Sequence, residues 1–322
     1  MKAIRIHAPG GPEAMRLEEL PDPVAGPGQA VVRTEAIGVN FIDVYQRTGL
    51  YKLDLPATLG VEAAGVVTAV GPEVQDVRPG DRVAWAMAPG AYATAAAIPA
   101  AKLVPVPERV TARHAAAALL QGMTAHYLAT STYPLGPGDT CLVHAAAGGV
   151  GLLLCQIARR RGARVLATVS TAAKADLALG AGADTVIRYD QEDFETAVRQ
   201  LSAGRGVQVV YDSVGQATYE KSLRSLAPRG MLVLYGQSSG AVPPIDPLLL
   251  SHRGSLFLTR PSLAHYSASR EELLTRAGEV LGWLGEGALT LRIGLELPLA
   301  QAAQAHRELE ARRTTGKVLL VP

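Results

Sequence analysis

The pattern of apolar and polar residues changes along the chain and predicts two kinds of structure. Up to about residue 118, short alternating runs are broken by glycine and proline. The runs that predict strands are Met1–His7, Met15–Leu20, Ala30–Ala36, Ala63–Val70 and Arg82–Trp85. Turn sequences such as Arg78-Pro79-Gly80-Asp81 separate them. We therefore expect residues 1–118 to form an all-β, barrel-like domain.

From about residue 119 to 258, apolar strands alternate with helices. The predicted strands are Cys141–His144, Arg164–Val169, Thr185–Tyr189, Val207–Val214, Met231–Gly236 and Ser255–Leu258, and the helices between them include Ala172–Leu179, Asp193–Ala203 and Tyr219–Leu226. Such alternation predicts an α/β fold with a doubly wound parallel sheet. Residues 259–322 add helices at Arg270–Leu284 and Ala300–Ala311 and a strand at Lys317–Val321. We expect this last segment to return to the first domain.

A glycine turn follows the first strand of the alternating region. It reads Gly148-Gly149-Val150-Gly151 and leads into a helix. Gly148 would let the backbone approach a pyrophosphate, and Gly151 would let the helix pack closely on the strand. Ala146 stands where the usual G-x-G-x-x-G motif has its first glycine, and an ordinary tight turn is the alternative. The order strand, turn, helix, strand predicts dinucleotide binding at the helix N-terminus.

The end of the second strand indicates which dinucleotide binds. An NAD site usually has an acidic residue there, but no Asp or Glu lies between Asp139 and Asp176. The chain instead has Ser170 and Thr171, with Lys174 one turn into the next helix. Hydroxyls and an ammonium suit a 2′-phosphate, which predicts NADPH. The alternative is that Lys174 is only a solvated helix residue.

Composition and charge indicate which kinds of partner and which cellular compartment the protein has. A net charge of +2 over 322 residues, without a basic stripe, argues against a nucleic-acid partner. No run of about 18 apolar residues exists to span a membrane. Two cysteines do not make a disulfide framework, and Met1–Ile6 alternates like a strand rather than a signal peptide. We expect a cytoplasmic protein.

Six blocks of sequence carry a family resemblance. They are Ile37–Tyr51, Leu59–Gly65, His144–Gly151, Tyr211–Gly215, Gly236–Gly240 and Thr259–Leu263, in collinear order over essentially the whole chain. The chain thereby resembles the zinc-free quinone oxidoreductases of the medium-chain dehydrogenase/reductase superfamily, the zeta-crystallin-like branch. The resemblance implies a GroES-like β-barrel catalytic domain, a Rossmann NADPH-binding domain at 119–258, and usually a homodimer joined through the Rossmann sheets.

The same resemblance bears on metal binding. Positions that hold catalytic zinc in the alcohol-dehydrogenase branch look like Asn40, Val61 and Leu120 here. An amide and two aliphatic side chains cannot replace the thiolate and imidazole ligands that zinc needs. The four-cysteine lobe for structural zinc is missing as well. No metal is expected.

The resemblance also implies the site residues. Asn40, Thr124 and Tyr127 should lie near the nicotinamide and its ribose, and Ser170, Lys174 and Tyr189 should hold the 2′-phosphate. Further cofactor contacts are expected from Gly148, Gly149, Val150, Gly151, Ser213, Gly236, Gln237, Ser238, Ser239, Thr259, Arg260 and Lys317. Tyr45 and Tyr51 should form the substrate wall, where an aromatic face can stack on a quinone; ordinary packing is the alternative.

The catalytic group stays open at this stage. Asn40 and Tyr51 are candidates, and water or Tyr51 could protonate the reduced product. Asp43 has two interpretations, a structural hydrogen bond or proton transfer. His144 and His126 are expected to be core histidines, and no Ser–His–Asp set is evident.

The predicted function is metal-free transfer of the nicotinamide C4 hydride to a quinone held between the β-domain and the Rossmann domain. One alternative is NADPH-dependent reduction of an activated C=C bond, as in alkenal or enone reductases. Another is a non-catalytic NADPH-binding protein. The acceptor and the number of electrons per step are left open.

Overall fold

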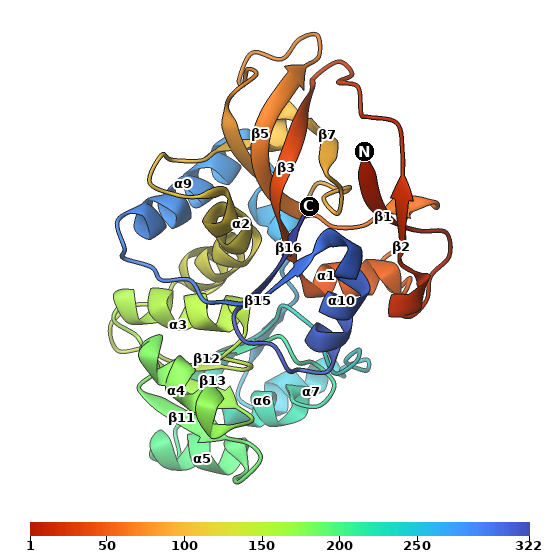
Figure 1. Ribbon diagram of the computed structural model, residues 1–322. Coiled ribbons are helices and arrows are strands. Elements are labelled where there is room, and N and C mark those ends of the chain that lie inside the picture. The colour runs from red at the N-terminus through yellow and green to blue at the C-terminus, as the bar shows by residue number, and fades with distance from the viewer. The chain divides into compact units, whose positions relative to one another are not determined.

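A computed structural model describes residues 1–322, and the chain forms two units within it (Figure 1). Unit 1 comprises Met1–Met123 and Tyr266–Pro322, and unit 2 comprises Thr124–His265. The sequence pattern places the corresponding boundaries at 118/119 and 258/259. The first boundary of the structure falls inside helix α2 (Ala112–Tyr127).

Unit 2 contains a six-stranded parallel sheet. Its strands are β9 (Thr140–Val143), β10 (Arg164–Val169), β11 (Thr185–Arg188), β12 (Val207–Asp212), β13 (Leu226–Leu234) and β14 (Phe257–Thr259). The order across the sheet is β11-β10-β9-β12-β13-β14, and all neighbouring pairs are parallel. This order confirms the predicted doubly wound sheet.

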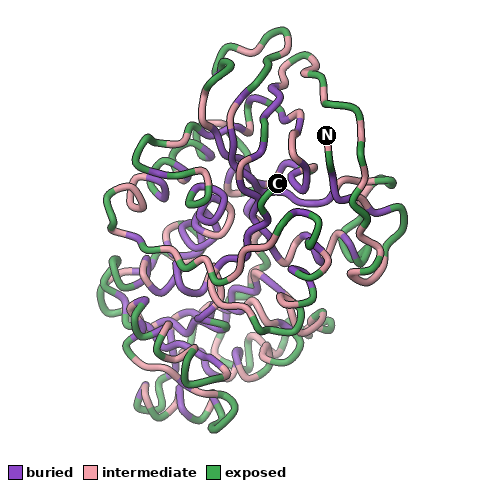
Figure 2. Tube along the Cα trace, in the orientation of Figure 1, coloured by how far each residue is buried: buried purple, intermediate pink, exposed green.

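The helices of unit 2 cover both faces of its sheet. They are α3 (Gly149–Arg160), α4 (Ala172–Gly180), α5 (Phe194–Leu201), α6 (Tyr219–Ser225), α7 (Pro247–His252) and the π-helix η3 (Leu128–Thr132). α3 contacts α4, and α5 contacts α6. Right-handed crossovers place these two pairs on opposite faces. Most residues of the inner strands β9, β10 and β12 are therefore buried, which explains their apolar runs, and Figure 2 shows the burial along the chain.

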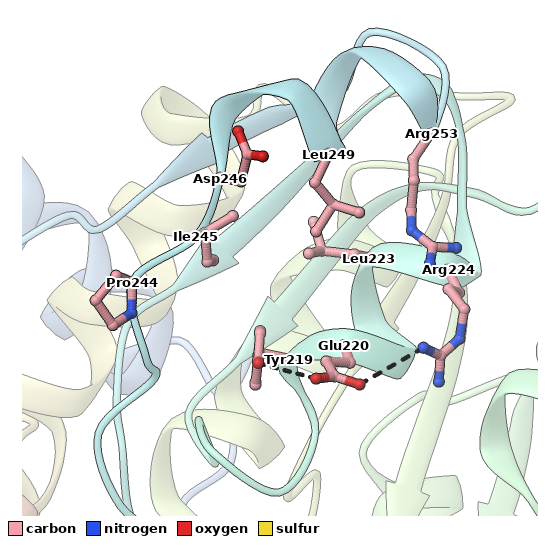
Figure 3. A pocket seen from close by; sticks show the side chains of 9 residues that line it. All are labelled: Tyr219, Glu220, Leu223, Arg224, Pro244, Ile245, Asp246, Leu249 and Arg253. Carbon is pink, nitrogen blue, oxygen red and sulfur yellow. Dashed lines mark hydrogen bonds and ion pairs between the residues drawn. The ribbon is translucent and has the colours of Figure 1, made fainter.

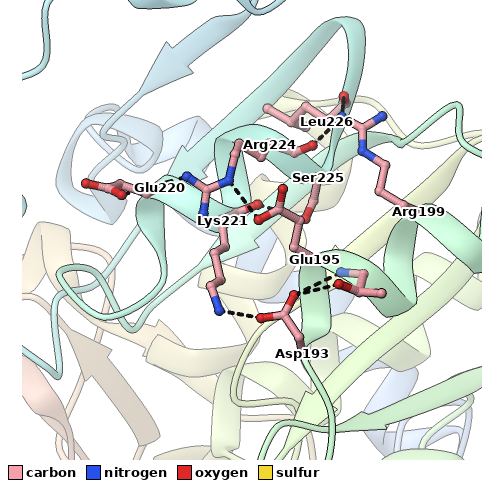
Figure 4. A network of polar contacts seen from close by, with 9 residues as sticks. Asp193, Glu195, Arg199, Glu220, Lys221, Arg224, Ser225 and Leu226 are labelled. Carbon is pink, nitrogen blue, oxygen red and sulfur yellow. Dashed lines mark hydrogen bonds and ion pairs between the residues drawn. The ribbon is translucent and has the colours of Figure 1, made fainter.

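Charged side chains join α5 to α6 (Figure 4). Arg224 on α6 binds Glu195 at 2.7 Å and lies 3.7 Å from Glu220. Lys221 pairs with Asp193, the N-cap residue of α5. Because these side chains are partly exposed, the network orients the helices and adds little to stability.

Unit 1 is built mainly from antiparallel strands. A three-stranded sheet has the order β2-β1-β4, with β1 (Lys2–Ile6), β2 (Arg16–Glu19) and β4 (Ala57–Thr58). The larger sheet has the order β15-β16-β3-β5-β6-β8, with β7 also paired to β3. Its strands are β3 (Gln29–Val39), β5 (Glu62–Val70), β6 (Arg82–Ala86), β7 (Ala95–Pro99), β8 (Val104–Pro105), β15 (Ile293–Pro298) and β16 (Lys317–Val321).

The last strand of the chain pairs with one of the first in unit 1. β16 runs antiparallel to β3, with Val318 opposite Val39. Trp85, Tyr92 and Leu320 pack in the core of this unit. The helices here are α1 (Phe41–Arg47), most of α2, α9 (Arg270–Gly285) and α10 (Ala302–Glu310), with short helices η1 (Pro12–Ala14), η2 (Ala100–Lys102) and η4 (Leu299–Gln301); α8 (Leu263–Tyr266) ends at the boundary.

The predicted and observed elements differ in a few places. Helix α1 and strands β7 and β15 are not predicted by the pattern. β7 reads Ala-Ala-Ala-Ile-Pro, which has little intrinsic strand preference, and it is a strand because it pairs with β3. β13 begins at Leu226, five residues before the predicted Met231. None of the helices combines the length and apolar character required to cross a membrane.

Candidate functional site

Most of the residues predicted to bind the nucleotide follow the six strands of the unit 2 sheet. Gly148–Gly151 follow β9, Ser170 and Lys174 follow β10, Tyr189 follows β11, Ser213 follows β12, Gly236–Ser239 follow β13, and Thr259 and Arg260 end and follow β14. Because parallel strands end at the same edge of a sheet, the structure gathers all these residues along one edge. In doubly wound sheets, ligands bind outside this edge.

The turn between β9 and α3 requires its glycines for different reasons. A Cβ on Gly151 would lie 2.5 Å from the carbonyl oxygen of Ala145, so only glycine allows this helix–strand contact. A Cβ on Gly148 would meet only that oxygen, at 3.2 Å. The contact at Gly148 is therefore tight but milder than the one at Gly151. α3 begins at Gly149 with no side-chain cap, which leaves its first turn suited to an anion.

The ends of β10 and β11 lie side by side without an unpaired carboxylate. The Tyr189 amide donates to the Val169 carbonyl at 3.2 Å, and the Tyr189 side chain is 47% exposed. Thr171 caps α4 by accepting from the Lys174 amide at 3.3 Å. The nearby acid Asp190 is paired with Arg188, whose hydrogen bond holds the pKa of Asp190 below its usual value. These residues suit a phosphate better than a ribose diol.

Hydrogen bonds fix the loops after β12, β13 and β14 to one another. The Ser239 hydroxyl donates to the Val214 carbonyl at 2.7 Å, and the Ser238 amide donates to the Ser213 carbonyl at 3.1 Å. Arg260 donates to the carbonyls of Leu234 and Gly236 at 3.0 and 2.8 Å. The guanidinium thus orders the loop that contains Gln237. A contact from Arg260 to the cofactor stays a prediction.

His144 is a core histidine, as expected. It is 1% exposed, and its ring nitrogens lie 2.9 Å from the Thr168 hydroxyl and 3.0 Å from the Ser222 hydroxyl. Burial lowers its pKa. Ser222 in turn donates to Asp212 at 3.0 Å, so the serine lies between the histidine and the acid. A nucleophilic triad needs the histidine in the middle. His126, which is 5% exposed, is buried as well.

Unit 1 contains a buried polar cluster around Asn40, which links β3 to α1. The Asn40 amide group donates to Glu62 Oε2 at 2.8 Å, and its oxygen accepts from Lys317 Nζ at 2.9 Å. Lys317 Nζ also lies 2.5 Å from Glu62 Oε2. The second oxygen of Glu62 accepts from the Leu120 amide at 2.6 Å. None of Asn40, Glu62 and Lys317 is more than 4% exposed.

A second chain of hydrogen bonds holds the backbone of Asn40. Asp43 Oδ2 accepts from the Asn40 amide at 2.8 Å and from the Tyr92 hydroxyl at 2.9 Å. His306 Nε2 lies 3.0 Å from that hydroxyl, and Arg47 lies 3.2 Å from Nδ1. Because Arg47 can only donate, Nδ1 accepts and the His306 proton is on Nε2. The Nε2–H group of His306 then donates to the Tyr92 hydroxyl, and this hydroxyl donates to Asp43.

The charges in this chain are nearly balanced. Arg47 pairs with Glu310 at 2.7 Å, and Lys317 pairs with Glu62. Asp43 is left without a cation of its own, and burial raises its pKa to about 7. Its Oδ1 has no hydrogen-bond partner. Burial and the Arg47 charge lower the pKa of His306 to about 3, so this histidine is neutral. Asp43 is the group that titrates near neutral pH.

Sequence reasoning missed most of this cluster. Glu62, Tyr92, His306 and Arg47 were not singled out, and Lys317 was expected to touch the nicotinamide half or the phosphates. The structure places the Lys317 ammonium on Asn40 and Glu62 instead, and contact with a cofactor stays a prediction. One signal was available, since a carboxylate within the buried strand β5 requires a partner.

The remaining predicted residues lie on α1, on α2 or in the following loop. The rings of Tyr45 and Tyr51 meet edge to face at 5.3 Å, and Tyr51 is 39% exposed. Thr124 and Tyr127 on α2 belong to unit 2 and are 8% and 1% exposed. An open aromatic pair is consistent with a substrate wall, and its role stays a prediction.

A separate pocket of about 270 Å³ lies between α6 and α7 (Figure 3). Tyr219, Leu223, Arg224, Leu249 and Arg253 are among the residues that line it. None of its lining residues belongs to the predicted site. Arg224 is already paired with Glu195 and Glu220, and we assign no function to this pocket.

Comparison with known proteins decides the family. Residues 26–108 match the family model of the alcohol dehydrogenase GroES-like domain, and residues 149–273 match that of the zinc-binding dehydrogenase. A quinone oxidoreductase of Pseudomonas aeruginosa is 45% identical over 100% of this chain and 99% of its own. The chain belongs to the quinone oxidoreductases. This family lies within the medium-chain dehydrogenase/reductase superfamily, and the protein is an oxidoreductase.

Two further relatives bear on the function. The quinone oxidoreductase of Escherichia coli, solved in complex with NADPH, has a TM-score of 0.98 and 42% identity, and the match covers 100% of both chains. A 2-haloacrylate reductase of a Burkholderia species is 43% identical over 98% of both chains. Quinone oxidoreductases and a 2-haloacrylate reductase are thus both found among similar proteins.

The name of the matched zinc-binding family raises the question of a metal. No group of three or more His, Cys, Asp or Glu side chains in residues 1–322 could hold an ion. Asn40, Val61 and Leu120, the positions compared with zinc ligands, offer one side-chain donor, and its oxygen already accepts from Lys317. The carboxylate beside them, Glu62, is bound to the same ammonium. These residues do not fit a zinc site.

Proposed function

We propose that this oxidoreductase uses NADPH to reduce quinones to hydroquinones. NADPH would supply a hydride from nicotinamide C4, and one proton from solvent or the protein would complete the balance to NADP⁺ and hydroquinone. The observation that carries the cofactor assignment is the end of β10, where Ser170 and Lys174 stand in place of an acid and Tyr189 is exposed beside them.

The residues of this chain would bind and position rather than react. The first turn of α3 and the glycine at 148 would accept the pyrophosphate. Lys174 would pair with the 2′-phosphate, and Ser170 and Tyr189 would donate hydroxyl hydrogen bonds to it. Asn40 would orient the nicotinamide half, while Tyr45 and Tyr51 would stack on the quinone. Position and exclusion of water would then favour hydride transfer.

Turnover assays test this proposal directly. The purified, chelator-treated protein would be given NADPH and a panel of quinones, and NADPH absorbance would be followed. Oxidation of NADPH by quinones supports the proposal, and spin detection of a semiquinone then tells one-electron from two-electron steps. NADPH binding without turnover of any acceptor would favour a binding protein instead.

The 43% identity to a 2-haloacrylate reductase favours a second candidate, reduction of activated C=C bonds. Such a reaction adds a hydride to the β-carbon and a proton to the α-carbon. It therefore needs a proton donor near the substrate, and the candidate is Tyr51, which is 39% exposed on the predicted substrate wall. The same assay with 2-alkenals, 2-cyclohexenone and 2-chloroacrylate separates the two reactions. Turnover of these acceptors alone would replace the quinone assignment.

We also propose that the protein works as a homodimer in the cytoplasm. β14 is an edge strand of the unit 2 sheet, with Phe257 56% and Leu258 36% exposed, and a second copy could pair with it. Light scattering tests the dimer, and Phe257→Lys should shift it toward monomer. The two cysteines, Cys141 and Cys155, are unpaired and buried, which is consistent with a reducing compartment.

A further inference from the structure

The cluster of Asn40, Glu62 and Lys317 fixes one amide in one orientation. The Asn40 oxygen faces only donors, the Lys317 ammonium at 2.9 Å and the Gln121 amide at 3.4 Å. The Asn40 nitrogen faces only acceptors, Glu62 at 2.8 Å and the Gly38 carbonyl at 3.3 Å. A rotated amide would place its oxygen against a carboxylate and its NH₂ against an ammonium, so the alternative orientation is excluded.

Lys317 also neutralises a carboxylate that is completely buried. Glu62 is 0% exposed, and the only cation bound to it is the Lys317 ammonium. A buried carboxylate needs such a partner. Glu62 cannot turn away, because its other oxygen accepts from the Leu120 amide at 2.6 Å. Gly38 further shows that the site is built for this carboxylate, since a Cβ there would lie 2.3 Å from Glu62 Oε2.

The cluster thus places the Lys317 ammonium at the positions that correspond to zinc ligands in the alcohol-dehydrogenase branch. Asn40 and the Leu120 backbone are two of these positions, and Glu62 follows the third in sequence. The donors there do not fit a metal, and the positive charge comes from the protein itself. We propose that Lys317 is a positioning residue for the reduction, which fixes the Asn40 amide toward the nicotinamide half and holds an ammonium group, paired with Glu62, beside that amide. This inference rests on the proposed function.

The test separates this role from that of a structural ion pair. Lys317→Met leaves Glu62 unpaired, so it should lower both stability and kcat. The double variant Glu62→Gln/Lys317→Met restores charge balance. It should regain most of the stability and bind NADPH within about threefold of wild type, while its kcat stays at least tenfold low with KM little changed. Recovery of wild-type kcat in the double variant would overturn the proposal.

Two further variants serve as controls, one that keeps the charge at position 317 and one that removes an ion pair outside the cluster. Lys317→Arg keeps the charge, so it should retain more kcat than Lys317→Met; equal values at equal stability would count against the proposal. Lys221→Met removes the exposed ion pair to Asp193 in unit 2 and should leave kcat unchanged.

A readout without turnover keeps the two proposals distinguishable. The emission maximum of bound NADPH responds to charge near the nicotinamide. It should shift in the double variant and stay unchanged in Lys221→Met. If wild type reduces none of the quinones or enones, the proposed function fails, and this spectrum still decides the role of Lys317. An emission maximum identical to wild type in the double variant would sink the inference.

Discussion

The hydroxyl of Tyr92 donates a 2.9 Å hydrogen bond to Asp43, a carboxyl group that has no cation of its own. Asp43 is completely buried, and its pKa is raised from 3.8 to about 7 by burial. Folding therefore favours its neutral form. This relationship makes the stability of the protein depend on pH in a way that variants can resolve.

We expect Asp43→Asn to remove a loss of stability at high pH. Between pH 3.8 and about 7 the unfolded carboxyl ionises while the folded one keeps its proton, so this group lowers stability as pH rises. Relative to wild type, the variant should gain on the order of 4 kcal/mol in unfolding free energy from pH 4 to pH 8. Denaturant unfolding at several pH values measures it.

His306 provides the control of opposite sign. Its pKa falls from 6.5 to about 3, so its contribution to stability is lost as pH decreases below 6.5. Between about pH 4 and 6.5, the opposite contributions of Asp43 and His306 to the pH dependence of the unfolding free energy nearly cancel in wild type. His306→Gln should therefore lose stability relative to wild type as pH rises over that range. A difference between Asp43→Asn and wild type that does not vary with pH would contradict the assignment.

Gly38→Ala should disrupt the Asn40 cluster. The new methyl would lie 2.3 Å from Glu62 Oε2 and 2.6 Å from the Ala116 carbonyl, and neither group has room to move. We expect a loss of about 1–3 kcal/mol. The matched control is Gly278→Ala in α9, which has nothing within 4 Å of the new Cβ and should gain about 0.5–1 kcal/mol. Equal effects of the two substitutions would argue against close packing at Gly38.

Gly148 and Gly151 should respond differently to alanine. Gly151→Ala places its methyl 2.5 Å from the Ala145 carbonyl, so it should cost about 1–3 kcal/mol in stability. Gly148→Ala places its methyl 3.2 Å from the same carbonyl, a milder contact, and should stay within about 1 kcal/mol of wild type. Its NADPH affinity should nevertheless fall at least roughly tenfold, because the methyl blocks the pyrophosphate. Fluorescence titration measures the NADPH affinity, and an undiminished affinity would contradict the assignment of the pyrophosphate to this turn.

Lys174→Glu should weaken NADPH binding at least roughly tenfold more than NADH binding, because a carboxylate would repel the 2′-phosphate. Dissociation constants for both cofactors decide the matter. Lys221→Glu, a charge reversal elsewhere in unit 2, should leave the NADPH-to-NADH ratio unchanged. If Lys174→Glu weakened NADPH and NADH binding equally, Lys174 would not be the residue that binds the 2′-phosphate.

How much the sequence predicted depends on how local each feature is. The strands and helices of unit 2 follow from periodicity within short windows, and the parallel order then brings Ser170, Tyr189 and Gly236 to one edge. The Asn40 cluster and its hydrogen-bond chain depend on residues far apart, since Glu62 and Lys317 are separated by 255 positions in the sequence and Arg47 and His306 by 259. No spacing rule joins such pairs.

Helix α1 shows a different kind of omission. Asp43 lies three positions after Asn40, the N-cap residue of α1, and its side chain accepts from the Asn40 backbone amide at 2.8 Å, which is half of a capping box. That pattern of a capping residue followed three positions later by an acid is visible in the sequence and would have predicted the helix. The two interpretations of Asp43, a structural hydrogen bond or proton transfer, did not include its role at the N-terminus of α1. The structure shows the support, through Asn40 and Tyr92.

The pairing of Glu62 with Lys317 has a consequence for how the protein is made. At roughly 5–20 residues per second, a ribosome needs tens of seconds to extend the chain by the 255 positions from Glu62 to Lys317. During that interval unit 2, a continuous segment, emerges whole and can fold, while β5 has no cation to accompany its carboxylate into a core. The larger sheet of unit 1 therefore cannot be completed, and the Glu62 carboxylate cannot be paired, until β16, the last strand, has been synthesised.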